Sequence, residues 1–172
     1  MRRILSVTLL SLVYVALQAQ LISFESLRDG VFDLTKIKKE LILNGFTKLT
    51  ASSNSDTDTY VYNYDETKQK ASIWVNITPL FELANAGLYS IDVLTSGDYL
   101  HDELLEEITE HCAFKEVGVG DGLVYTCDYA AFVVSSQGGN RLIGAYPNFE
   151  KLAEEMTEEE LEEFMKAIEE MN

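Results

Sequence analysis

Side chains that could work together in catalysis are scarce in this chain of 172 residues. Its two histidines, His101 and His111, lie ten residues apart on a stretch that predicts a helix. On one helix their directions differ by roughly 80°, and about 15 Å separates them along the axis. His111 and Cys112 are adjacent and therefore point in different directions. We infer that nucleophilic catalysis is disfavoured, which leaves the scattered Asp and Glu side chains as the remaining acid–base groups.

Metal ligands are also sparse, because the chain contains neither Cys-x-x-Cys nor His-x-x-x-His. One oxygen-rich stretch has the spacing of a calcium-binding loop, with its six positions at Asn54, Asp56, Asp58, Tyr60, Tyr62 and Asp65. However, Thr59 stands where such loops need glycine, and Asp65 is shorter than the usual glutamate. We therefore expect a plain polar loop, with no metal and no cofactor, and keep calcium as the weaker alternative.

The N-terminus has the layout of a secretory signal peptide. Two arginines precede an almost unbroken apolar stretch, residues 4–17, and small residues stand at Ala16 and Ala19. The apolar stretch is shorter than the roughly 20 residues of a membrane span. We therefore expect residues 1–19 to be cleaved, leaving residues 20–172 as a single domain without a membrane span. Export to the periplasm or the extracellular space follows from this prediction.

Export would place Cys112 and Cys127 in an oxidising compartment, where two cysteines tend to pair. Cys112 ends a predicted helix and Cys127 lies in the next predicted strand. A helix packed across that strand can bring the two Cα atoms within about 6 Å. We expect a structural disulfide that closes a loop of about fifteen residues. Two buried free thiols are the alternative.

The charge of the chain limits its partners. Asp and Glu number 29 against 13 Lys and Arg, which gives a formal net charge of −16. A chain this acidic repels phosphate groups, so nucleic acids are excluded as partners and anionic membrane surfaces are disfavoured. A protein or a small ligand remains as the expected partner.

Hydrophobic periodicity predicts an α+β fold. Leu34, Ile37 and Leu41 mark one face of a helix that ends at Asn44-Gly45. A second helix is expected around residues 99–112, and residues 21–30 read as a short strand or an extended arm. Period-2 alternation predicts six strands: 60–64, 73–77, 88–95, 123–129, 131–135 and 141–146. A link over residues 78–87, with one helical turn, separates the second strand from the third.

This order predicts an antiparallel sheet of about six strands with helices mainly on one face. It could be two α-β-β-β units, residues 33–95 and 98–147. An offset of 68 residues places Ile37 on Leu105 and Phe46 on Phe114. An α+β chain that alternates in this way without duplication is the alternative.

The C-terminus predicts an acidic amphipathic helix over residues 157–171. Thr157-Glu158-Glu159-Glu160 has the pattern of a capping box, and an apolar stripe follows it. From residue 150 to residue 172 there are ten Glu and two Lys. A solvated helix face is the simpler interpretation, and an acidic tail that binds a basic partner is the functional one.

Aromatic residues supply the candidate binding site. Trp74 lies out of phase with the apolar positions of its strand, so it is expected to face away from the helices. If Tyr60, Tyr62 and Tyr64 share that side, the sheet has an open aromatic face for a protein or a flat ligand. The sequence therefore predicts a secreted or periplasmic, non-enzymatic binding protein. The alternatives are a small carboxylate-dependent hydrolase and a structural component of the cell envelope.

Overall fold

The computed structural model describes residues 21–50, 56–83, 86–97, 99–137, 139–162 and 166. These residues form one antiparallel sheet of eight strands, in the order β1-β2-β3-β4-β8-β7-β6-β5, together with helices. The predicted α+β class is therefore confirmed, whereas the predicted number of about six strands is wrong. The elements in chain order are α2 (Phe24–Gly30), α3 (Leu34–Leu43), β1 (Thr47–Lys48), β2 (Asp58–Tyr62), β3 (Ile73–Leu83), β4 (Ala86–Thr95), α4 (Tyr99–His111), β5 (Ala113–Val117), the 3₁₀ turn η1 (Val119–Asp121), β6 (Leu123–Thr126), β7 (Ala130–Gln137), β8 (Asn140–Pro147) and α5 (Phe149–Glu155).

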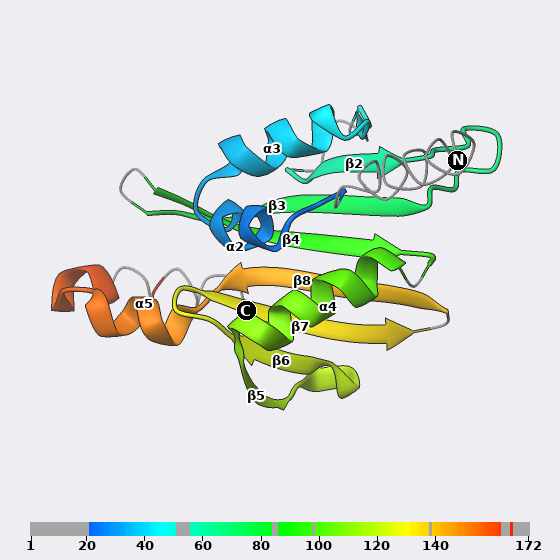
Figure 1. Cartoon of the computed structure of the whole chain (residues 1–172). Coiled ribbons are helices and arrows are strands. Elements are labelled where there is room, and N and C mark those ends of the chain that lie inside the picture. Colours follow the sequence, from blue (N-terminus) through cyan, green and yellow to red (C-terminus); the bar gives the residue numbers. More distant parts are fainter. Residues whose placement is uncertain are drawn as a thin grey trace, which may run out of the picture.

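The helices α2, α3 and α4 lie over the same face of the sheet (Figure 1). Their inner faces bury apolar side chains such as Leu27, Ile37 and Leu104 against strand residues that include Ile91 and Phe132. Each fully buried side chain of this size contributes about 1.5–3 kcal/mol before entropy is counted. The core therefore lies between these helices and one side of the sheet. No helix within the described residues is long and apolar enough to span a membrane.

Residues 21–30, expected to be a strand or an arm, contain the helix α2. The Ser23 side chain caps this helix and accepts a hydrogen bond from the Ser26 N–H at 3.2 Å. Phe24 and Leu27 lie one turn apart and are both buried. Seven residues are too few to display a helical period in the sequence, which explains the error.

The link predicted over residues 78–87 is also wrong, because β3 continues to Leu83 and pairs with β4 as a long hairpin. Proline normally interrupts a central strand because it has no N–H to donate. Here β2 begins at Asp58, opposite Ile77, so Pro79 lies beyond the part of β3 that pairs with β2 and is paired only with β4. A register shift between Pro79 and Phe81 accommodates the ring.

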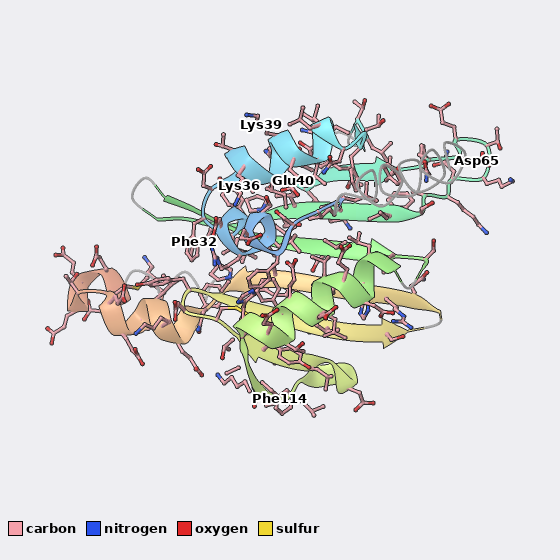
Figure 2. The ribbon with its side chains drawn as sticks, in the orientation of Figure 1. Phe32, Lys36, Lys39, Glu40, Asp65 and Phe114 are labelled. Carbon is pink, nitrogen blue, oxygen red and sulfur yellow. A yellow bond between two sulfur atoms is a disulfide. The ribbon has the colours of Figure 1, made fainter. Side chains whose placement is uncertain are left out.

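The two strands missing from the sequence analysis are the edge strands of the sheet. β1 has two residues, too few for any alternation. All five residues of β5 are exposed, so β5 lacks the apolar alternation that marks a strand with one buried face. Figure 2 labels Phe114 on β5 at this outer edge.

The sheet has two topologically equivalent halves. Each half is a helix followed by four antiparallel strands, α3 with β1–β4 and α4 with β5–β8, and the halves meet where β4 pairs with β8. At this junction the Asp92–Gly144 pair is flanked by Ile91 opposite Ala145 and by Val93 opposite Ile143. The predicted units had three strands each and lacked the edge strand.

The predicted offset of 68 residues matches the ends of the two helices, Leu43 of α3 and His111 of α4. The fully buried positions are Ile37 and Leu41 in α3 and Leu104 and Ile108 in α4, whereas Leu105 is half-buried. The duplication itself remains a prediction.

The predicted capping box is present at the start of the last helix. The Thr157 N–H donates to Glu160 Oε2 at 2.9 Å, and the Glu160 N–H donates to Thr157 Oγ1 at 3.3 Å. The predicted apolar stripe of this helix and the predicted signal peptide fall largely outside the described residues.

Candidate functional site in a groove beside the disulfide

Two of the predicted binding residues, Tyr60 and Tyr62, lie on the helix-covered face. The register places Tyr60 opposite Val75 and Tyr62 opposite Ile73. Tyr60 is 3% exposed, and the Tyr62 ring packs on Phe46 with 5.2 Å between ring centroids. The expectation that these two tyrosines share a face with Trp74 is therefore wrong. A period-2 pattern shows which residues share a side but not which side is covered.

The other two predicted residues, Tyr64 and Trp74, do come together. Trp74 is half-buried and lies opposite Val61, on the side of the sheet turned away from α2, α3 and α4. The Tyr64 ring meets it edge-to-face, with centroids 5.9 Å apart and an interplanar angle of 82°. The Tyr64 hydroxyl donates to Gln69 Oε1 at 2.7 Å, which fixes the ring. The predicted aromatic face is thus reduced to one pair.

A polar pair at the centre of the same side escaped the sequence analysis. The Tyr146 hydroxyl donates to Asp92 Oδ1 at 2.9 Å across β4 and β8. A Cβ on Gly144 would lie 2.6 Å from the Tyr146 ring, so the glycine makes room for that ring. Burial raises the pKa of the Asp92 carboxyl, and the hydrogen bond from Tyr146 partly opposes this shift. The sequence offered one signal for this pair, because Asp92 is a charged residue within an otherwise largely apolar strand.

The described residues of the weak calcium-loop candidate are not brought together. Asp58 lies 3.0 Å from Lys38 Nζ and 2.5 Å from Lys48 Nζ, and these contacts hold the pKa of its carboxyl low. Asp65 binds Thr67 and Lys68 in a separate turn. Asp56 is exposed, and Asn54 lies outside the described residues. In the described part of the chain no group of three potential metal ligands forms.

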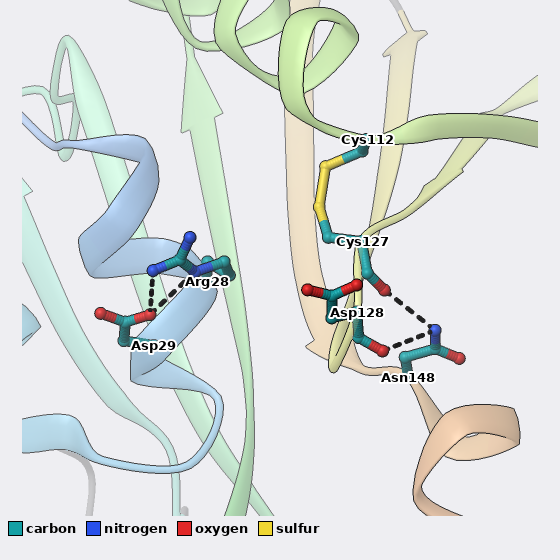
Figure 3. The surroundings of a disulfide bond; sticks show 6 residues. All are labelled: Arg28, Asp29, Cys112, Cys127, Asp128 and Asn148. Carbon is teal, nitrogen blue, oxygen red and sulfur yellow. Dashed lines mark hydrogen bonds and ion pairs between the residues drawn. A yellow bond between two sulfur atoms is a disulfide. The ribbon is translucent and has the colours of Figure 1, made fainter.

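A groove of about 1190 Å³ lies between α2, the turn from β6 to β7 and the start of α5. Figure 3 shows Arg28 and Asp29 of α2 on one wall, facing Cys127, Asp128 and Asn148 on the other. The groove is lined by Phe24, Glu25, Arg28, Asp29, Phe32, His111, Ala113, Thr126, Cys127, Asp128, Tyr129, Asn148, Lys151 and Leu152.

One wall of the groove is positioned by the ring of Phe24. This ring is buried and stacks between Phe132 of β7, at 5.4 Å, and His111 at the end of α4, at 5.3 Å. The Arg28 guanidinium lies 5.9 Å from the Phe24 centroid and pairs with Asp29 at 2.8 Å. His111 therefore lines the groove, whereas His101, near the other end of α4, contacts Asp102 and Arg141.

The opposite wall is held by Asn148. Its Nδ2 donates to the carbonyl oxygens of Cys127 at 3.0 Å and Asp128 at 3.3 Å, while its Oδ1 caps α5 by accepting from the Lys151 N–H. The Cys112 and Cys127 sulfur atoms lie at disulfide distance, with the Cα atoms 4.5 Å apart. The bridge and the amide together join the end of α4, the β6–β7 turn and α5.

The charges along the groove are unevenly paired. Arg28 pairs with Asp29, and Lys151 with Glu154 at 3.0 Å, which raises the pKa of Lys151. The Tyr129 hydroxyl donates to Glu155 Oε1 at 3.0 Å, and this bond raises the pKa of Tyr129. The carboxylates of Glu25 and Asp128, one on each wall, form no ion pair or hydrogen bond with the described residues.

The two carboxyl groups whose pKa is raised lie away from the groove and from each other. Asp92 is on β4, and Glu103 is on α4, where burial and the neighbouring Glu107 and Glu106 raise its pKa. Neither of these two carboxyl groups belongs to the lining of the groove.

Comparison with known proteins gives no relative: no family model, no curated protein and no solved structure matches this chain.

Proposed function

We propose that this chain is an exported, non-enzymatic binding protein whose ligand occupies the groove between α2 and α5. The observation that carries the proposal is the groove itself, about 1190 Å³, whose lining includes the accessible aromatic side chains of Phe32, His111 and Tyr129. Rigid aromatic side chains provide a large contact area at a low entropy cost, and binding sites are enriched in them. Asn148 and the disulfide hold the wall opposite α2, so the site is largely formed before the ligand arrives.

A carboxylate-dependent hydrolase is the alternative, and the placement of the acids argues against it. Hydrolysis of this type uses a protonated acid beside a second carboxylate, within roughly 10 Å. Asp92 instead accepts a hydrogen bond from the Tyr146 hydroxyl, and the residue opposite it on β8 is Gly144. Glu103 lies among other glutamates of α4.

The sheet face is a weaker binding candidate than the groove. Of the four aromatic side chains predicted for it, Tyr60 and Tyr62 belong to the helix-covered side. The remaining pair, Tyr64 and Trp74, offers less contact area than a groove with rings on several elements.

The proposal is tested by blocking the groove. Ala113 lines the groove and is exposed on β5, so Ala113→Trp fills space without entering the core. Val117, on the same strand but outside the groove lining and 58% exposed, provides the matched control Val117→Trp. We expect the tagged protein to recover a partner from its own cell-envelope and medium fractions, and Ala113→Trp but not Val117→Trp to abolish that recovery. Equal recovery by both variants would contradict the proposal.

A further inference from the structure

We infer that the groove binds a basic segment of another protein, with one lysine or arginine side chain seated between Glu25 and Asp128. This inference rests on the proposed function, because it assigns the chemistry of the ligand to the same groove. It starts from the distribution of charge on the two walls.

The groove contains two cationic side chains that are already neutralised and two carboxylates that are not. Arg28 and Lys151 pair with Asp29 and Glu154, which are their neighbours on α2 and α5. Glu25 on α2 and Asp128 on the β6–β7 turn carry no such partner among the described residues. An incoming cation between the two walls would therefore find two free carboxylates, and charge-assisted hydrogen bonds of this kind are stronger than neutral ones.

The aromatic lining suits the rest of such a side chain. One cation–π contact is already present beside the groove, between the Arg28 guanidinium and the Phe24 ring, which is itself only 2% exposed. Phe32 and Tyr129 also line the groove. Lysine and arginine bury their methylene stems along apolar surfaces while the charged head reaches a polar partner. The groove offers both surfaces at once.

The surroundings of the groove favour a protein segment over a small cation. α5 contributes to the lining of the groove, and α5 together with the start of the next helix exposes a run of glutamates: Glu150, Glu154, Glu155, Glu158, Glu159 and Glu162. The whole chain carries a net charge of −16. A negative surface that extends beyond the groove attracts a partner that is basic over several residues, and this attraction weakens with salt.

The test measures the binding of a defined peptide by fluorescence anisotropy. The probe is a labelled ten-residue peptide of alternating arginine and leucine, and its matched control has citrulline, which is uncharged, in place of arginine. The groove variant is Glu25→Gln/Asp128→Asn. The control variant Glu66→Gln/Glu106→Gln removes the same two charges from exposed sites outside the groove lining. Circular dichroism checks that the unmodified protein and the two variants are folded.

We expect the groove variant to weaken binding of the arginine peptide at least about tenfold and the control variant less than about twofold. The citrulline peptide should bind the unmodified protein at least about tenfold more weakly. An equal loss in both variants, or tight binding of the citrulline peptide, would overturn the inference. If the arginine peptide does not bind while Ala113→Trp still abolishes partner recovery, this inference fails and the proposed function stands.

Discussion

At the scale of single residues, Asp92 gives the chain a pH-dependent stability. Burial raises the pKa of its carboxyl above the ordinary value of 3.8, so the folded protein holds this proton at pH values where the unfolded chain has lost it. The free energy of unfolding therefore decreases as the pH rises from about 3.8 through the raised pKa. The ionised carboxyl therefore lowers the free energy of unfolding at neutral pH, whereas the protonated carboxyl in acid does not.

Asp92→Asn should remove this dependence. The amide oxygen can still accept from the Tyr146 hydroxyl, and no charge has to be buried. We expect the variant to be at least as stable as the parent at pH 7, by up to about 1–2 kcal/mol, with a smaller difference at pH 3. Urea melts at pH 3, 5 and 7 measure it, with the exposed Asp56→Asn as control. Parallel stability curves for parent and Asp92→Asn would refute the assignment.

Tyr60 and Tyr64 provide a matched test of the corrected sheet faces. Tyr60 is buried opposite Val75, so Tyr60→Ala should lower the free energy of unfolding by about 3–5 kcal/mol. Tyr64→Ala removes one hydrogen bond and one edge-to-face contact at the surface, and we expect a cost near 1 kcal/mol. Denaturant melts of the two variants decide the point. A larger loss of stability in Tyr64→Ala than in Tyr60→Ala would contradict the assignment of these tyrosines to opposite faces of the sheet.

At the scale of elements, a single carboxylate fastens α2 to α3. Glu40 of α3 accepts from the Ser23 N–H at 2.7 Å and from the Ser23 hydroxyl at 3.0 Å, and it also binds the Ser26 hydroxyl. Figure 2 labels Glu40 on the side of α3 that faces α2, near the exposed Lys39. Because α2 has seven residues, it is not stable without such tertiary contacts.

Glu40→Ala should therefore destabilise the fold by about 1–3 kcal/mol, because it leaves partly buried donors unpaired. Lys39→Ala, on the same helix, should cost less than about 0.5 kcal/mol. Hydrogen exchange adds a local readout: the amides of α2 should exchange faster in Glu40→Ala, more than those of β7. Uniform acceleration across the chain would show that Glu40 supports the whole fold and not α2 in particular.

The Cys112–Cys127 bridge is a second link between elements of the fold. It would tie the end of α4 to the turn that forms one wall of the groove. In the chain-entropy model, closing fifteen residues stabilises a fold by about 3 kcal/mol. We expect Cys112→Ser/Cys127→Ser to lose roughly that amount in denaturant melts. Non-reducing peptide mapping of protein from its native compartment should find the bridge, and two free thiols there would contradict it.

At the scale of the whole molecule, the first prediction is processing. The apolar N-terminus predicts export and removal of residues 1–19. The intact mass of the native protein should therefore correspond to a chain that begins near Gln20. Recovery of the full-length chain from detergent-extracted membranes would show instead that the apolar segment is an anchor.

Elements with a local signal could be predicted from the sequence. α3 has a helical period and ends at Asn44-Gly45, where Gly45 adopts a φ of 84° that other residues rarely accept. The capping box at Thr157 is equally local. The short helix α2 and the edge strand β5 lack any periodic signal, and the length of β3 depends on where its neighbour β2 ends.

The candidate site could not be predicted, for a related reason. Its walls come from α2, from the β6–β7 turn and from α5, and α2 lies about a hundred residues before the other two. Nothing in Glu25 or Asp128 marks them in the sequence, because only the tertiary arrangement brings both to the groove without a partner among the described residues.

The junction of β4 with β8 has a consequence for the origin of the chain. If the two halves descend from one ancestral unit, that unit would have formed a homodimer in which its last strand, the equivalent of β4 and β8, paired with its own copy. Residues at a two-fold axis between antiparallel copies of one strand face themselves, and if Asp92 and Gly144 are equivalent positions, the axis passes through their pair. Two aspartates directly opposite each other repel. Fusion into one chain allows the two positions to differ, so that one keeps the carboxyl while the other, as glycine, admits the Tyr146 ring that binds it.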